Sequence, residues 1–170
     1  MKKVGVLIEN YFDEKELIYP YFRLQEDFKV DLIGTEKNVE YTGKSGSFKM
    51  KSNISSKEAN PDDYEAIYIP GGFSPDGMRG CEDTIEFINK IHEQNKPIAA
   101  ICHGPWVLAD AIDLKGIKMT SVPKIKNDFI HAGCEWIDEA VVIDKNIITS
   151  RTPSDISKQV PKFVEMIKNK

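Results

Sequence analysis

The chain has 170 residues, of which 41% are hydrophobic and 29% charged; this composition is typical of a globular protein with one domain, residues 1–170, and excludes a disordered or fibrous chain. Its formal net charge of −4 leaves no basic face for a phosphate backbone, so we expect no nucleic-acid binding. No apolar stretch approaches twenty residues and no signal-peptide pattern occurs, so we expect a cytoplasmic protein without membrane contact.

Short apolar runs alternate with amphipathic segments along the whole chain. The apolar runs predict buried strands at 4–8, 30–33, 66–69, 97–101, 140–143 and 147–149. Helical spacing of apolar residues predicts helices at 14–26, 84–94, 105–111 and from 152 onward. Pro20 should kink or divide the first of these helices, and the glycine-containing segment 39–50 predicts a small antiparallel hairpin at an edge of the sheet. This order of elements predicts an α/β protein folded as a three-layer α/β/α sandwich.

The richest strand end in the sequence is the segment Ala100–Trp106, AICHGPW. Ligands of such folds bind beyond the carboxyl ends of the strands, and here an apolar strand ends on Cys102 just before a helix that begins with proline. The positive end of that helix should lower the pKa of the thiol and make it a thiolate nucleophile. The amide of His103 is placed to stabilise an oxyanion, as in other nucleophile elbows. A lone cysteine is more often a buried core residue, but the Cys-His-Gly-Pro turn favours the nucleophile.

Two further strand ends carry candidate residues. The segment Tyr68–Asp76, YIPGGFSPD, contains paired glycines whose amides can approach a ligand, and Gly72 is the candidate second oxyanion donor. The segment after the first strand contains three acids, one of which could exchange a proton with Cys102, and the residues alone do not choose among Asp13, Glu14 and Glu16. The cysteines form no C-x-x-C pair and fit free thiols in a reducing compartment, at positions 81, 102 and 134.

Four segments together resemble the PfpI family of intracellular cysteine peptidases, namely DEKELIYP at 13–20, YIPGGFSPD at 68–76, AICHGPW at 100–106 and IITSRTPSD at 147–155. That family belongs to the superfamily of the parkinsonism-associated deglycase, which has the class I glutamine amidotransferase-like fold. The resemblance implies a flavodoxin-like, doubly wound and mostly parallel sheet. It also implies self-association into a homodimer or a larger homo-oligomer.

The resemblance assigns roles to individual residues. It implies that Cys102 is the nucleophile, that His103 is its catalytic neighbour, and that Glu16 is the acid in contact with the thiol. It implies an oxyanion hole formed by the amides of Gly72 and His103. Asp76 occupies the position of a glutamate that reaches this histidine across a subunit boundary in the peptidases, and in this chain the acid is one methylene shorter.

Two classes of function remain open. The first is a cysteine enzyme, either a hydrolase or peptidase acting on peptides or a glyoxalase or deglycase-type enzyme acting on small reactive aldehydes in stress protection. The second is a non-catalytic redox-sensing stress protein or chaperone that uses an oxidisable Cys102. Neither class requires a cofactor or a metal. A glutaminase and a serine hydrolase are disfavoured, because the chain lacks a downstream H-x-E arrangement and a G-x-S-x-G motif.

Overall fold

The structure is a computed structural model that describes all residues, 1–170. Its centre is a seven-stranded sheet formed, in spatial order, by β10 (Val142–Asp144), β11 (Ile147–Ser150), β7 (Ile98–Ile101), β6 (Ala66–Ile69), β1 (Lys3–Ile8), β2 (Lys29–Gly34) and β5 (Ile54–Ser55). Only the β10–β11 pair is antiparallel. The strands β1, β2, β6, β7 and β11, numbered in chain order, lie in the order 2-1-3-4-5 of flavodoxin-like folds. The predicted doubly wound sheet is therefore confirmed.

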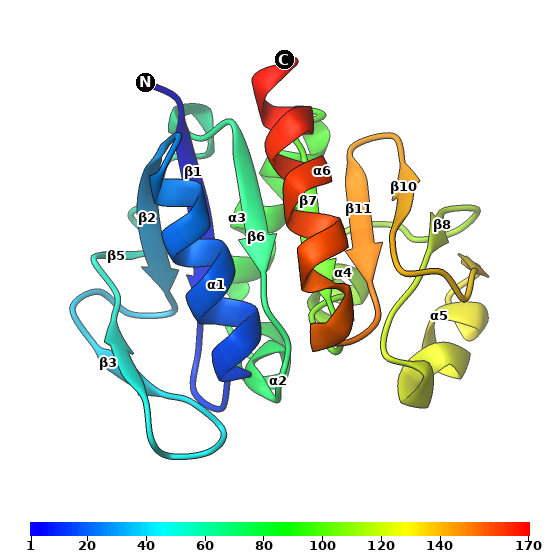
Figure 1. Cartoon of the computed structure of the whole chain (residues 1–170), viewed down its shortest axis with the longest axis horizontal. Coiled ribbons are helices and arrows are strands. Elements are labelled where there is room, and N and C mark those ends of the chain that lie inside the picture. The colour runs from blue at the N-terminus through cyan, green and yellow to red at the C-terminus, as the bar shows by residue number, and fades with distance from the viewer.

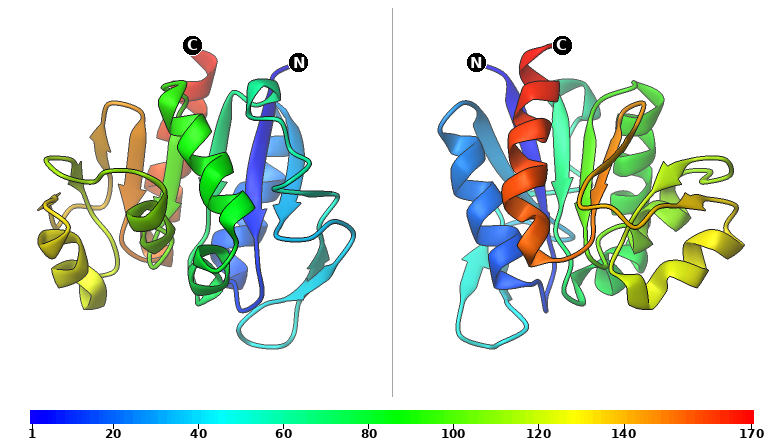
Figure 2. Two further views of the ribbon diagram at one scale, coloured as in Figure 1. Left: turned by 180° about the vertical axis from the view of Figure 1, so that it is seen from behind. Right: turned by 45° about the vertical axis from the view of Figure 1, so that its right-hand side comes forward.

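Helices cover both faces of this sheet (Figures 1 and 2). The first face is covered by α1 (Glu14–Gln25) and α6 (Ile156–Lys168). The second face is covered by α2 (Ser74–Arg79), α3 (Glu82–Glu93) and α4 (Trp106–Ala111). Beyond β10 lie three small elements, β8 (Lys118–Met119), α5 (Lys126–His131) and β9 (Glu135–Trp136). The three-layer α/β/α sandwich is confirmed. None of the helices is long and apolar enough to cross a bilayer.

The buried strands explain why apolar runs were the clearest signal in the sequence. All four residues of β6 and all four of β7 are buried, because each strand has helices on both of its faces. Along β6 the side chains alternate between the two cores, so that Ile67 and Ile69 pack on the α3 side and Ala66 and Tyr68 on the α1 side. The continuous apolar runs therefore indicate strands that are covered by helices on both faces, which is the central layer of the sandwich.

The predicted antiparallel hairpin is present, but its place and the effect of Pro20 each differ in one respect from the expectation. Pro20 does not divide α1, which runs unbroken from Glu14 to Gln25; a proline removes one helical hydrogen bond while the neighbouring bonds remain. The hairpin β3 (Glu40–Thr42) and β4 (Lys49–Lys51) is a separate two-stranded sheet and not an edge of the central one, whose edge strand is β5. Its backbone bonds instead hold the loop after β1: Tyr11 N donates to Thr42 O over 2.7 Å.

Candidate active site

Cys102 lies in a sharp turn between β7 and α4. Its φ angle is +62°, a left-handed conformation that costs a non-glycine residue about 1–3 kcal/mol and is typical of functional sites. The turn is held on both sides, because Cys102 N donates to Ser150 O and Cys102 O accepts from Val122 N, each over 3.0 Å. Gly104 is required here, since a methyl group at its Cα would lie 2.6 Å from Ile69 O. Cys102 therefore lies in a strained and firmly held turn, and its role as the nucleophile of an elbow stays a prediction.

Glu16, in the first turn of α1, points into the protein and is fully buried. One carboxyl oxygen accepts a hydrogen bond from Gly71 N over 2.8 Å, and the other, Oε2, has no partner. A methyl group at the Cα of Gly71 would lie 2.6 Å from Glu16 Oε1 and 3.0 Å from Cys102 Cβ. The carboxyl group, Gly71 and Cys102 are thus packed against one another, which the resemblance implied for Glu16 and the residues alone did not.

The other two acids of this loop have different partners. Asp13 caps α1, because its Oδ1 accepts from Lys15 N over 3.0 Å and from Glu16 N over 3.2 Å. Glu14 lies at the surface and accepts from Ser45 N over 3.0 Å. Of the three candidates, only Glu16 is brought to the thiol.

Burial decides the ionisation of this pair. It raises the pKa of Glu16 to about 8, with a further contribution from the negative charge of Asp13 and a partial opposing effect of the Gly71 hydrogen bond. Burial and the Glu16 charge also raise the pKa of the Cys102 thiol to about 12, against a lowering contribution from the His103 amide. The expected lowering of the thiol pKa was wrong. The helix that was to lower it, α4, has six residues and begins only at Trp106, and the thiol is partly buried beside an acid.

The raised pKa of Glu16 predicts a pH-dependent stability. An ordinary carboxyl with a pKa near 4.5 loses its proton in the unfolded chain, whereas the folded chain keeps that proton up to about pH 8. The stabilisation is therefore complete below pH 4.5 and is lost as the pH rises to 8, at no more than about 1.4 kcal/mol per pH unit for one proton. We expect Glu16→Gln to remove this slope in urea unfolding measured from pH 5 to 8. Equal slopes in the variant and the parent would contradict the raised pKa.

Two backbone amides lie next to the thiol, and that of His103 also hydrogen-bonds the Cys102 sulfur, whose pKa it lowers. Neither Gly72 N nor His103 N donates to a protein oxygen. Gly72 has a φ of +70°, and a methyl group on its Cα would collide with the backbone of Tyr11 and Asp13, so only glycine fits there. Both predicted oxyanion donors therefore lie in tightly defined turns beside Cys102.

The ring of His103 stands between two aromatic side chains. Its Nδ1 is 3.5 Å from Cys102 Sγ, and its centroid lies 6.0 Å from that of Phe73 and 5.0 Å from that of Trp106. Burial, with the charges of Lys124 and Lys44, lowers its pKa. The imidazole is therefore neutral at pH 7, and no carboxylate of the chain hydrogen-bonds it.

Asp76 is not brought to His103 within one chain. It lies in α2 with an exposed side chain that makes no hydrogen bond or ion pair. The inter-subunit role that the resemblance implies for Asp76, and the homo-oligomer that this role requires, both stay predictions.

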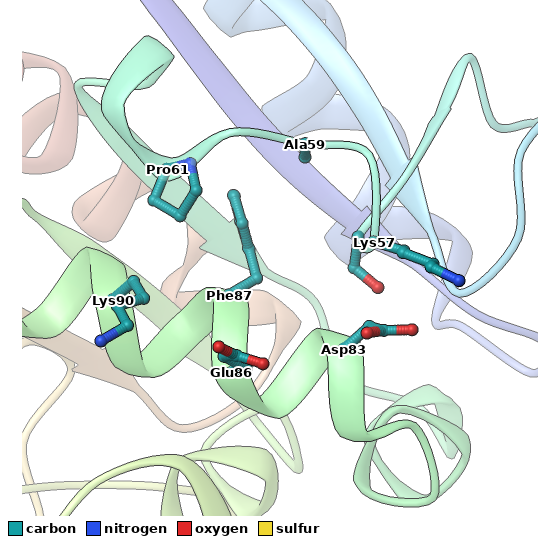
Figure 3. Close-up of a pocket in the computed structure, with 8 residues that line it drawn as sticks. Lys57, Ala59, Pro61, Asp83, Glu86, Phe87 and Lys90 are labelled. Carbon is teal, nitrogen blue, oxygen red and sulfur yellow. The ribbon is translucent and has the colours of Figure 1, made fainter.

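A pocket of about 210 Å³ lies elsewhere, between α3 and the segment after β5 (Figure 3). Most of its polar side chains are ordinary surface charges, such as Asp83, Glu86 and Lys90 (Figure 3). Ser56 also lines it, but its hydroxyl is 2.8 Å from Thr84 Oγ1. No group of three histidine, cysteine or acidic side chains is arranged to hold a metal ion anywhere in the chain. This pocket contains none of the predicted catalytic residues Cys102, His103 and Glu16.

Comparison with known proteins gives one consistent result. A model of the DJ-1/PfpI family matches residues 2–166. Deglycase PfpI of Pyrococcus furiosus is 42% identical over 167 residues, and Deglycase PH1704 of Pyrococcus horikoshii is 40% identical over 166; each alignment covers 98% of this chain and 99% of the relative. The chain is also similar to the crystal structure of a two-domain protein of Anabaena variabilis that contains dj-1/thij/pfpi-like and ferritin-like domains. The two superpose with a TM-score of 0.96 at 36% sequence identity, and the match covers 99% of this chain and 48% of that protein.

Proposed function

The chain is an enzyme of the DJ-1/PfpI family, and we propose that it acts through Cys102 on small reactive aldehydes and the adducts they form with amines, without a cofactor. The observation that carries this proposal is the buried Glu16 carboxyl packed beside the thiol. Such a pair holds a proton next to a nucleophile in a site that needs no metal.

The pair can supply both the nucleophile and the acid. Because burial disfavours two negative charges, the first proton lost belongs to the pair as a whole. The state with a thiolate at Cys102 and a proton on Glu16 attacks the aldehyde carbon, forming the carbon–sulfur bond and leaving a negative charge on oxygen. The amides of Gly72 and His103 stabilise that oxyanion. The proton of Glu16 then moves to it and completes a hemithioacetal.

Methylglyoxal leads from this hemithioacetal to a hydroxy acid without an oxidant. A base removes the hydrogen of the former aldehyde carbon, and a proton returns to the adjacent carbon, so that one carbon is oxidised and its neighbour reduced. The product is a thioester of Cys102, and water hydrolyses it to lactate and the free thiol. The neutral imidazole of His103, 3.5 Å from the sulfur, and the Glu16 carboxylate are the two available bases.

Aldehyde chemistry suits this site better than amide hydrolysis. A peptidase must protonate a leaving amine, and in cysteine and serine peptidases a histidine does so while an acid orients it. In one chain no carboxylate hydrogen-bonds His103, and Asp76 is exposed. The Glu16 pair, by contrast, needs no contribution from another subunit.

The test compares three substrates with the same preparation: methylglyoxal, a methylglyoxal-modified amine and a fluorogenic peptide. We expect turnover of the first two and little cleavage of the peptide. Cys102→Ala, purified in parallel, serves as the control for contaminating activity. Peptide cleavage with no consumption of aldehyde would overturn the proposal, as would equal aldehyde consumption by Cys102→Ala.

A further inference from the structure

Lys44 approaches the active site from the β3–β4 hairpin. Its Nζ lies 2.6 Å from Oδ2 of Asp13, whose side chain is only 3% exposed. The other oxygen of the same carboxylate caps α1 at Glu16 N. A single carboxylate therefore joins the ammonium group of the hairpin to the helix turn that carries the catalytic acid.

The hairpin is attached to the active-site loop at several points besides this ion pair. Lys44 N donates to Phe12 O over 2.9 Å, and Ser45 N donates to the Glu14 carboxylate over 3.0 Å. The loop in turn pairs with the glycine segment, because Phe73 N donates to Tyr11 O over 2.8 Å. The position of Lys44 is thus fixed by backbone bonds and not only by its flexible side chain.

We propose that Lys44 is a positioning residue of the active site, and that its ion pair with Asp13 controls the pH at which the pair formed by Glu16 and Cys102 ionises. This inference rests on the proposed function of the Glu16 and Cys102 pair. It adds a regulator of that pair which lies on an element outside the central sheet.

The charges around Glu16 give the ion pair a defined effect. Asp13 raises the pKa of Glu16 and Lys44 lowers it, so the two partners oppose each other. Glu16 also faces Cys102 at the end of β7 and Tyr68 on β6, whose hydroxyl donates a hydrogen bond to Gln159. The Cys102 sulfur in turn lies 3.5 Å from Nδ1 of His103, whose lowered pKa keeps it neutral at pH 7. Tyr68 stays neutral because burial raises its pKa well above the ordinary value. Lys44 is therefore the only cation among these groups.

The test measures the rate at which iodoacetamide alkylates Cys102 as a function of pH, with the labelled cysteine identified by peptide mass spectrometry. In Lys44→Met the ionisation midpoint should move up by about 1 pH unit, because a negative Asp13 is left unpaired beside the pair. In Asp13→Asn the midpoint should move down, since asparagine keeps the helix cap and removes the charge. The double variant should return close to the parent. Lys44→Arg should keep the parental midpoint.

The control is Lys49→Met, which removes an exposed ammonium group of the same hairpin that lies 3.9 Å from Glu40. Its midpoint should match that of the parent. Unchanged midpoints in Lys44→Met and Asp13→Asn, with only a lower melting temperature, would show a purely structural ion pair and overturn the inference. An equal shift in Lys49→Met would also overturn it. Because alkylation requires no turnover, opposite shifts in a protein that consumes no aldehyde would sustain the inference while refuting the proposed function.

Discussion

Cys102→Ala is expected to lower kcat/KM for methylglyoxal by roughly 10³-fold or more, because no other nucleophile stands at the elbow. Cys102→Ser should be almost as inactive, since a hydroxyl has a far higher pKa than a thiol and the Glu16 proton cannot be shared with it in the same way. Both variants should remain folded, because the turn is held by backbone bonds to Ser150 and Val122. Turnover is measured at pH 7 to 8 alongside the melting temperature.

The matched control is Cys81→Ala, which replaces another free, half-buried thiol that is not part of this turn. The Cys81 thiol contacts Ser56 Oγ at 3.9 Å and lies just before α3. Its replacement should change turnover by less than about twofold, as expected for a substitution outside the site. Loss of activity on replacing Cys81, or retention on replacing Cys102, would move the nucleophile away from the elbow.

Glu16→Gln is expected to reduce kcat by roughly 10²–10⁴-fold, the usual contribution of a general acid or base. The amide keeps the shape of the side chain and can still accept from Gly71 N through its oxygen. It has no proton to give to the oxyanion, so turnover falls while Cys102 still reacts with iodoacetamide. The measurement pairs steady-state kinetics with the alkylation rate of the same sample.

Glu16→Ala separates this chemical role from a structural one. Removing the carboxyl leaves Gly71 N buried without an acceptor, which costs about 1–3 kcal/mol of stability, and it also changes the thiol environment. We therefore expect a lower melting temperature and an altered alkylation profile in the alanine variant, in addition to lost turnover. If the glutamine and alanine variants both kept parental turnover, proton transfer would pass to His103.

The strands of the sheet and the turn at Cys102 could be predicted because each depends on residues that are close together in the sequence. A strand with helices on both faces needs apolar residues without interruption, so β6 and β7 stand out as continuous runs. The turn at Cys102 needs a glycine where backbone carbonyls approach closely, and Gly104 supplies it two residues later. By contrast, β8, with two residues, and α2, with six, were missed, because neither segment contains a continuous apolar run or a helical period.

Tertiary structure alone decided the chemistry of the site. The sequence alone allowed any of three acids to lie near Cys102. Asp13 and Glu16 are three positions apart, a spacing that would also fit a capping box at the start of the helix. In the structure the Glu16 side chain instead accepts a hydrogen bond from Gly71 N, 55 residues along the chain. The direction of the thiol pKa likewise depends on burial and on this distant carboxyl, neither of which a strand–turn–helix pattern contains. The ion pair between Lys44 and Asp13 could not be predicted from the sequence, because a lysine in a glycine-containing hairpin is usually solvated. Only the folded chain places its ammonium group against Asp13.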